Sequence, residues 1–197
     1  MTAPGIAFVV VGYLSGSIPF SYLMGRAFGK KDIRREGSGN VGATNVFRVA
    51  GRTAGIAAAA GDILKSLLPV LAARLAGLDP SWTAATAAAV IIGHCYPVWL
   101  RFSGGKGVNS TVAVFAVISW PALLVFAAVW LTCFFTTRLV SLASLLATAT
   151  LPAAIYFSGG DGSYLVLALG TVLFIFYRHR ANIGRLLAGT ESQMGKK

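Results

Sequence analysis

The sequence has few charged residues, and very few of these are acidic. Only 12% of its 197 residues are Asp, Glu, Lys or Arg, whereas soluble domains carry about 25%. Hydrophobic residues account for 56%. This shortage of charge excludes an ordinary soluble domain and indicates an integral membrane protein. Because only six side chains are carboxylates, a Mg²⁺ or Zn²⁺ centre is not expected, and we expect no metal or other cofactor.

Cysteine is almost absent, and so are long polar stretches. Cys95 and Cys133 lie inside apolar runs without the spacing of a metal or redox motif, so we expect buried, reduced thiols. A separate soluble domain has no room, and residues 1–197 are predicted to form a single transmembrane domain. The net charge of +11 does not indicate a nucleic-acid partner, because the basic residues flank apolar runs. Contact with the lipid bilayer explains them better.

Apolar runs alternate with polar connections, and the charges of these connections predict a topology. The runs cover residues 5–25, 53–77, 82–100, 111–137, 139–157 and 163–177. Fourteen of the 17 Lys and Arg residues lie in three connections, at residues 26–52, 101–110 and 178–197. The connections around residues 77–82 and 158–163 carry only Asp79 and Asp161 as charges. The positive-inside rule therefore places the three basic segments in the cytoplasm and the N-terminus outside.

For this scheme to hold, the run at residues 111–137 has to enter the membrane from the cytoplasm and return to the same side. A single crossing would place every later basic segment outside. Ser119-Trp120-Pro121 is the expected break, since proline disrupts a helix interior and tryptophan favours the interface. At ~1.5 Å per residue the run is too short for two full crossings. The prediction is an all-α integral membrane protein, a seven-helix transmembrane bundle, N-out and C-in, with short or re-entrant segments within about 111–137.

One polar segment stands out in this apolar chain, GSGNVGATNVFR at residues 37–48. It follows four basic residues in the same connection, Lys30, Lys31, Arg34 and Arg35. Glycines let backbone N–H groups approach an anion closely, and a guanidinium grips phosphate in a bidentate fork. The segment is therefore predicted to bind phosphate at the membrane surface. Its candidate residues are Ser38, Gly39, Asn40, Thr44, Asn45 and Arg48.

A second candidate is the loop Ser103-Gly-Gly-Lys-Gly107, which resembles a phosphate cradle. Its candidate residues are Gly104, Gly105, Lys106 and Gly107. The spacing of glycine and lysine is not that of a Walker A loop, which excludes an ATPase. A plain turn between helices is the alternative interpretation. His94 precedes the loop and is either a satisfied interface histidine or part of the site.

A third candidate is RHRANIGRLLAGTE at residues 178–191. In a helix His179 and Asn182 share one face, and Arg185 follows them. Arg178 and Arg180 also have a simpler interpretation as topology anchors. Under the predicted topology all three segments lie on the same face of the membrane. They supply cations and backbone donors but hardly any carboxylate, which is the pattern of a metal-free site for two phosphate groups.

Two charged residues fall inside the second apolar run, where charge is costly. Asp62 and Lys65 are three residues apart on one helix face, so they can pair. Both a structural ion pair and a role lining the active cleft remain open. Small residues such as Gly55, Gly61 and Gly93 favour close helix packing in lipid.

In these segments the chain resembles the bacterial acyl-phosphate:glycerol-3-phosphate acyltransferases, the PlsY family of membrane phospholipid synthesis. The resemblance includes GSGNVGATNVFR, GHCYPVWLRFSGGKGV and HRANIGRLLAGTE, and it extends in order over essentially the whole chain. It implies a multi-pass enzyme of the bacterial inner membrane with a cytoplasmic active site and no obligatory protein partner. The implied reaction moves an acyl group from a long-chain acyl phosphate to the 1-hydroxyl of sn-glycerol 3-phosphate, giving lysophosphatidate and inorganic phosphate.

The resemblance also implies roles for individual residues. Ser38 and Arg48 would bind glycerol phosphate or support catalysis. Lys106, His179 and Asn182 would help form the phosphate pocket. Gly104, Gly105 and Gly107 would bind the acyl phosphate through their backbone. Glu191 would have a structural role.

Two questions stay open at this point. The proton of the attacking hydroxyl goes either to His179 or to the phosphate of the bound substrate. Substrate assistance is favoured, because no His–carboxylate pair is readable in the sequence. A phosphate or glycerol-phosphate transporter is the alternative function. Against it, the sequence has no repeat that would build a site at the membrane midplane.

Overall fold

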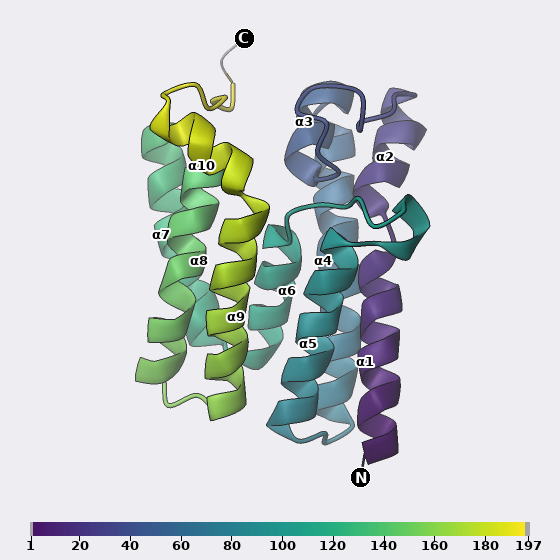
Figure 1. Cartoon of the computed structure of the whole chain (residues 1–197), viewed down its shortest axis with the longest axis vertical. Coiled ribbons are helices and arrows are strands. Elements are labelled where there is room, and N and C mark those ends of the chain that lie inside the picture. The colour runs from purple at the N-terminus through teal and green to yellow at the C-terminus, as the bar shows by residue number, and fades with distance from the viewer. Residues whose placement is uncertain (1, 196–197) are drawn as a thin grey trace. The chain divides into compact units, whose positions relative to one another are not determined.

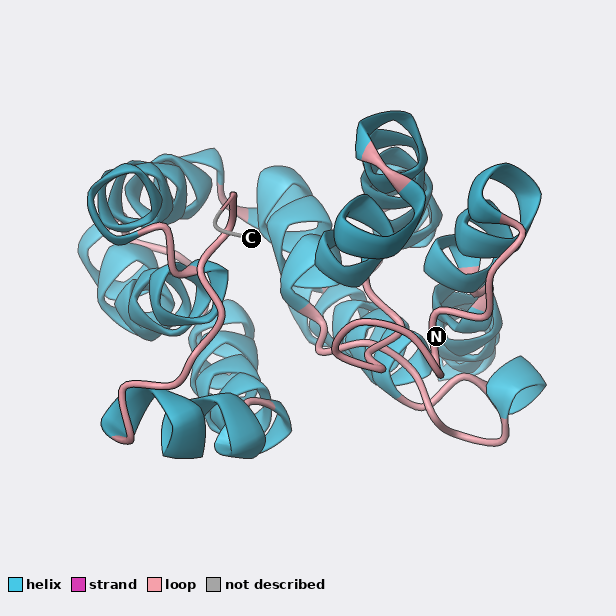
Figure 2. Cartoon of the chain, turned by 90° about the horizontal axis from the view of Figure 1, so that it is seen from above, coloured by secondary structure: helices cyan, strands magenta, loops and turns pink. Residues whose placement is uncertain are grey.

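The computed structural model of the chain describes residues 2–195, and Lys196 and Lys197 of the basic C-terminal segment lie outside the described residues. Helices and loops make up this part of the chain, with no strand in it (Figure 2). In chain order (Figure 1) the helices are α1 (Thr2–Ser17), α2 (Phe20–Gly29), α3 (Ala43–Ala50), α4 (Arg52–Leu75), α5 (Pro80–Cys95), the 3-10 turn η1 (Val98–Leu100), α6 (Val108–Ile118), α7 (Trp120–Thr137), α8 (Val140–Phe157), α9 (Gly162–Arg178) and α10 (Arg180–Leu187).

The helices group into two compact units, Met1–Val117 and Ile118–Lys197. In the first unit α1 packs against α5 and α4, while α2 and α3 pack on α4 and on each other. In the second unit α8 lies between α7 and α9, and α10 follows α9. A single transmembrane domain over residues 1–197 stays a prediction.

The helices are those of a multi-pass membrane protein. Within residues 2–195 five helices are long and apolar enough to cross a membrane, namely Ala3–Gly29, Arg52–Leu75, Pro80–Leu100, Trp120–Thr137 and Val140–Phe157. A sixth candidate is the pair formed by α9 and α10, which is bent by 63°. The prediction of an all-helical membrane protein is confirmed for the described residues. The count of seven crossings and the orientation stay predictions.

The predicted break inside residues 111–137 is confirmed. Helix α6 ends at Ile118 and α7 begins at Trp120, with Pro121 in its first turn. Between them Ser119 caps α7, because its hydroxyl accepts a hydrogen bond from the N–H of Ala122 at 3.4 Å. With 11 residues, α6 is about half as long as a full membrane crossing requires. It is the short segment that the topology argument demanded.

Glycines bring α1 and α5 into unusually close contact. A methyl group added to Gly16 would overlap the backbone carbonyl of Val90, and one added to Gly93 would overlap that of Tyr13. Gly61 similarly makes room for the ring of Phe20 on α2. The predicted packing role of the small residues is thus confirmed. Since α5 leads directly into the second polar loop, this contact fixes where that loop begins.

Candidate functional site

The first polar segment folds around one buried amide. The loop between α2 and α3 is held by Asn45, which is 1% exposed. Its Nδ2 donates to the carbonyls of Ile33 and Glu36 at 2.8 and 3.0 Å, and its Oδ1 accepts from the N–H of Ser38 at 2.9 Å. Gly37 sits against this amide with φ of 60°, a conformation that favours glycine. Asn45 therefore shapes the loop from behind.

The remaining candidates of this segment face outward. Ser38, Gly39 and Arg48 are exposed, whereas Asn40 and Thr44 are half-buried. Arg48 lies in the last turn of α3, so the loop and its guanidinium belong to one short structural unit. The arrangement leaves a hydroxyl and a cation accessible above a rigid base. That this segment binds an anion stays a prediction.

One of the basic residues before this segment is already paired. The Arg34 guanidinium forms two hydrogen bonds with the Asp32 carboxylate, from Nε at 2.9 Å and from the terminal nitrogen at 2.7 Å. This side-chain hydrogen bonding holds the pKa of Asp32 well below its ordinary value. Arg34 also stacks over the ring of Tyr22, 4.8 Å from its centroid. We infer that Arg34 orders the loop, because a neighbouring carboxylate already neutralises its charge.

The second polar loop folds back onto the end of α5. The N–H of Gly104 donates to the carbonyl of Cys95, and that of Gly105 to the carbonyl of His94, both at 3.1 Å. These two amides are therefore already paired within the protein. Gly107, with φ of 91°, turns the chain into α6. The first turn of α6 presents its N–H groups and the positive end of the helix dipole beside Lys106, which is half-buried.

The first two polar segments meet at Gly105. A methyl group added there would lie 2.9 Å from the backbone oxygen of Val41, in the first segment, and would overlap the ring of His94. Only glycine fits between these two neighbours. The prediction that the two segments come together is therefore confirmed within the first unit.

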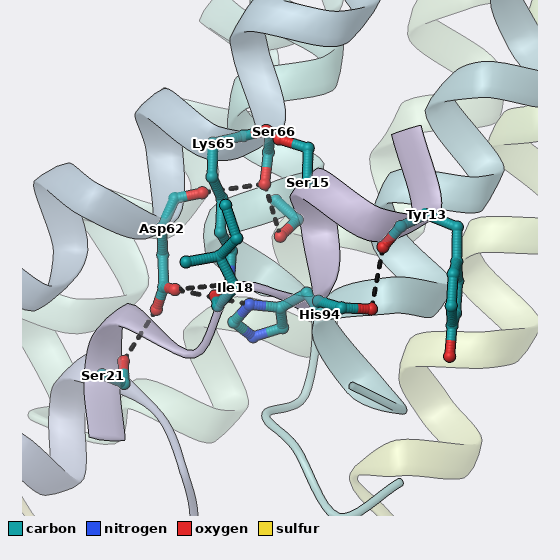
Figure 3. Close-up of polar contacts among 10 residues, drawn as sticks. Tyr13, Ser15, Ile18, Ser21, Asp62, Lys65, Ser66 and His94 are labelled. Carbon is teal, nitrogen blue, oxygen red and sulfur yellow. Dashed lines mark hydrogen bonds and ion pairs between the residues drawn. The ribbon is translucent and has the colours of Figure 1, made fainter. Parts of the chain in front are cut away.

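A buried charge cluster lies beneath this junction (Figure 3). Asp62 and Lys65 form the ion pair that their spacing predicted, at 2.8 Å, with side chains 1% and 3% exposed. The other carboxylate oxygen of Asp62 accepts from the Ser21 hydroxyl at 2.7 Å. Lys65 donates to the carbonyl of Ile18, at the break between α1 and α2, at 2.6 Å. The pair therefore has hydrogen-bond partners on both sides.

The cluster includes a histidine that the sequence interpretation did not pair with an acid. Nδ1 of His94 lies 3.6 Å from the Asp62 carboxylate, and the ring is 6% exposed. The fold thus contains a His–carboxylate pair that could not be read from the sequence. Because the partners lie on α4 and α5, no spacing within one helix reveals them. The available signal was the high cost of a buried Asp62, which calls for several polar partners.

Hydrogen bonds extend the cluster along the first unit. Ser66 joins α4 to α6 through the hydroxyl of Ser110 at 2.9 Å. The Ser15 hydroxyl donates to the carbonyl of Lys65 at 2.7 Å, and the Tyr13 hydroxyl donates to the carbonyl of Tyr96 at 3.0 Å. Helices α1, α4, α5 and α6 are thereby tied together just behind the polar loops.

The third polar segment, in the second unit, is organised by Glu191. One carboxylate oxygen accepts from Asn182 at 2.5 Å and from the Ser141 hydroxyl at 2.7 Å, and the other accepts from Arg185 at 2.7 Å. Burial raises the pKa of Glu191, but the hydrogen bonds from Ser141, Asn182 and Arg185 outweigh it, so the pKa lies below its ordinary value. The structural role that the resemblance implied for Glu191 agrees with this geometry.

His179 is buried at the junction of α9 and α10, 3% exposed. Its Nδ1 donates to the carbonyl of Ile175 at 2.9 Å, since a carbonyl can only accept. In the neutral ring Nε2 then carries the lone pair. Asn182 is buried as well, whereas Arg185 is exposed. Whether this segment joins the first two at one site stays a prediction.

Within the described residues no group of three or more His, Cys, Asp or Glu side chains is arranged to hold a metal ion. Among the described residues Cys95 and Cys133 are buried and form no disulfide, as expected. The structure thus defines a class of protein: a multi-pass helical membrane protein whose polar loops are basic and rich in glycine.

The comparisons with known proteins give the family. A family model described as glycerol-3-phosphate acyltransferase matches residues 6–189, and the chain belongs to this family. The glycerol-3-phosphate acyltransferase of Nitrobacter winogradskyi is 44% identical over 98% of this chain and 97% of its own. That of Brucella anthropi is 44% identical over 98% and 94%, respectively.

Solved structures show the same relationship. The crystal structure of PlsY, an integral membrane glycerol 3-phosphate acyltransferase, in its glycerol 3-phosphate form has a TM-score of 0.92 to this chain. It is 39% identical and covers 98% of this chain and 96% of its own. The lysophosphatidic acid form has a TM-score of 0.87 with 37% identity and the same coverage.

Replacing Glu191 by Gln is expected to lower stability in a pH-dependent way. The folded-state pKa of this carboxyl is below its ordinary value of 4.5, so its contribution is fully present above that value and is lost as pH falls through the folded pKa. At neutral pH the variant should lose about 1–3 kcal/mol. Thermal unfolding in detergent, from neutral to acidic pH, measures the difference.

The matched control is Glu36→Gln, an exposed acid 4.0 Å from Lys31, whose surface pair contributes little. It should unfold like the wild type at every pH. A gap between wild type and Glu191→Gln that stays constant into strong acid would contradict the assigned role of the Glu191 charge.

Proposed function

We propose that the protein transfers a fatty acyl group from acyl phosphate to the 1-hydroxyl of sn-glycerol 3-phosphate, giving lysophosphatidate and inorganic phosphate. Acyl transfer to glycerol 3-phosphate follows from its family. The donor and the position of the ester are the parts that we propose. The observation that carries the proposal is the meeting of two anion-binding segments at Gly105 and Val41, since two phosphorylated substrates have to lie side by side.

The two loops differ in the substrate that suits them. The loop of Ser38 and Arg48 offers a hydroxyl and a bidentate cation, which fit the phosphate and hydroxyls of glycerol 3-phosphate. Gly39, Asn40 and Thr44 flank these groups, and Asn45 acts through the loop. The second loop holds the donor through Lys106, Gly107 and the start of α6. Gly104 and Gly105 contribute mainly by packing, because their amides already have partners.

The chemistry asks for little beyond position and charge. The hydroxyl oxygen of glycerol 3-phosphate attacks the acyl carbonyl carbon, and the bond from that carbon to the phosphate oxygen breaks. Phosphate leaves with the electron pair, and the positive charge of Lys106 stabilises it. The hydroxyl proton goes to the phosphate of the bound glycerol 3-phosphate, whose second pKa is about 6. His179 and Asn182 then serve to bind phosphate, with Arg185 nearby on the same helix.

Replacement of His179 by Ala tests this assignment of the base. If substrate assistance holds, the variant keeps most of its turnover number at saturating substrate, while KM for glycerol 3-phosphate rises. Steady-state kinetics with both substrates varied separates the two parameters. A turnover number lower by about 10²-fold or more would instead identify His179 as the general base.

A comparison of donors with one matched pair of variants tests the reaction as a whole. Purified protein should release inorganic phosphate and form lysophosphatidate from acyl phosphate and glycerol 3-phosphate, and it should do so poorly with acyl-CoA. Arg48→Ala should lose about 10²- to 10³-fold in kcat/KM, as expected for removal of a charged hydrogen-bond donor.

The control is Arg52→Ala, which removes another exposed basic residue, at the start of α4, and should retain wild-type activity. If the protein neither releases phosphate from acyl phosphate nor transfers the acyl group of acyl-CoA, but carries glycerol phosphate into vesicles, the transporter alternative is favoured. The comparisons do not favour that alternative, because the relatives are named as acyltransferases.

We further propose that the chain lies in the bacterial inner membrane with seven crossings, its N-terminus outside and its C-terminus and active site in the cytoplasm. The short helix α6 and the α9–α10 pair complete the five long helices in this scheme. It is supported by the basic residues at 26–52, 101–110 and 178–197, which the positive-inside rule assigns to the cytoplasm.

Reporter fusions check this orientation. A reporter fused to the C-terminus should be found in the cytoplasm. A reporter inserted at Gly159-Gly160, between α8 and α9, should be found outside. An insertion at Gly77, between α4 and α5, is a second outside position and serves as control. A C-terminal reporter that is active outside would exclude the seven-crossing scheme.

A further inference from the structure

His94 occupies a position between the charge cluster and the donor loop. Nδ1 of its ring faces the Asp62 carboxylate at 3.6 Å, and the opposite nitrogen, Nε2, lies directly beneath Gly105, where a methyl group would overlap it. The backbone carbonyl of the same residue accepts the N–H of Gly105 at 3.1 Å. Ring and backbone of one residue therefore support one short stretch of loop.

The acidic partner of His94 is itself held in place. Asp62 pairs with Lys65 at 2.8 Å and accepts from the Ser21 hydroxyl at 2.7 Å. Lys65 is in turn fixed to the carbonyl of Ile18 at 2.6 Å. Figure 3 shows Ser21 on one side of the Asp62 carboxylate and His94 on the other. Since Asp62 cannot move without breaking these contacts, it provides a fixed negative charge against which the ring of His94 is oriented.

The loop above has little freedom to adjust. Gly105 is confined between the His94 ring below and the carbonyl of Val41, which would be 2.9 Å from a methyl group at this position. Lys106 and the start of α6 follow immediately. A small tilt of the ring would therefore move Gly105 toward or away from Val41. Lys106 and the start of α6, which we assign to the donor phosphate, would move with it.

We propose that His94, oriented by Asp62, is a positioning residue that sets the affinity of the Ser103–Gly107 loop for the phosphate of the acyl donor. This inference rests on the proposed function for the identity of the donor. It assigns His94 no contact with either substrate and no proton transfer. Its effect is on binding of the donor phosphate and of inorganic phosphate, the product that leaves the same loop.

Two amide substitutions separate the two ends of the ring. In His94→Gln the amide reaches the place of Nε2 beneath Gly105, whereas in His94→Asn it reaches only the place of Nδ1 near Asp62. Support of the loop thus survives in the first variant and is lost in the second. We expect His94→Gln to keep KM for acyl phosphate within about threefold of the wild type, and His94→Asn to raise it about tenfold or more.

The same variants should leave KM for glycerol 3-phosphate unchanged. The inhibition constant of inorganic phosphate should rise in parallel with the KM for acyl phosphate. Thr86→Val is the structural control, because Thr86 is a fully buried polar residue on the same helix whose hydroxyl donates to the carbonyl of Trp82. It is expected to change the unfolding temperature without changing KM for the donor.

A second measurement covers the case in which His94→Asn fails to fold. Gly105→Ala presses a methyl group against the ring and should raise KM for the donor, and adding His94→Ala should recover part of that loss by making room. Such coupling shows up as non-additive effects in a double-mutant cycle. Additive effects in this cycle would overturn the proposal.

The remaining outcomes are equally decisive. Equal changes in both KM values, or an unchanged KM for the donor in His94→Asn, would overturn the positioning role. If the wild type does not use acyl phosphate, the proposed donor is wrong. Inorganic phosphate then still tests His94, because its stabilising effect on thermal unfolding should be present in wild type and His94→Gln and weak in His94→Asn. Equal stabilisation of all three proteins would overturn the inference.

Discussion

The ion pair between Asp62 and Lys65 is the interaction on which the first unit depends. Charges inside a membrane protein are costly and persist only where both are matched. Here each charge also meets a helix end: Lys65 binds the carbonyl of Ile18 just after α1, and Asp62 binds Ser21 in the first turn of α2. These contacts agree in sign with the negative C-terminal end of α1 and the positive N-terminal end of α2. The pair therefore stabilises the break at Pro19, and loss of one partner would cost roughly 3–5 kcal/mol.

This break and the Ser103–Gly107 loop share the same carboxylate. From the break α2 leads into the loop that Asn45 holds, while His94 connects Asp62 to Gly105. The positions of both polar loops of the first unit therefore depend on the carboxylate of Asp62. Such an arrangement suits a reaction between an activated acyl group and a hydroxyl, because most of the rate then comes from holding two reactants in register and from charge placed in advance.

Different parts of this structure were predictable from the sequence to different degrees. The break at Ser119-Trp120-Pro121 followed from a proline and a count of charges, and the Asp62–Lys65 pair followed from spacing within one helix. Both are local properties. The Asp62–His94 pair was not predictable, because it depends on how α4 packs against α5. The glycines at 104 and 105 suggest backbone N–H groups that donate to an anion, yet these groups donate to the last carbonyls of α5. A glycine that binds an anion and a glycine that permits close packing look alike in a sequence.

Each of the three polar segments has one buried or partly buried polar side chain that supports it from behind. Asn45 binds three backbone groups, His94 supports Gly105, and Glu191 collects Ser141, Asn182 and Arg185. Arg48 and Lys106 are then presented by backbone that is already fixed. A flexible loop would lose part of its binding free energy in ordering itself around a phosphate. Because these supports carry that cost during folding, the two cations need no reorganisation of the backbone before they bind an anion. If they hold the substrates as proposed, substitutions behind the loops should affect binding as strongly as substitutions that touch the substrates.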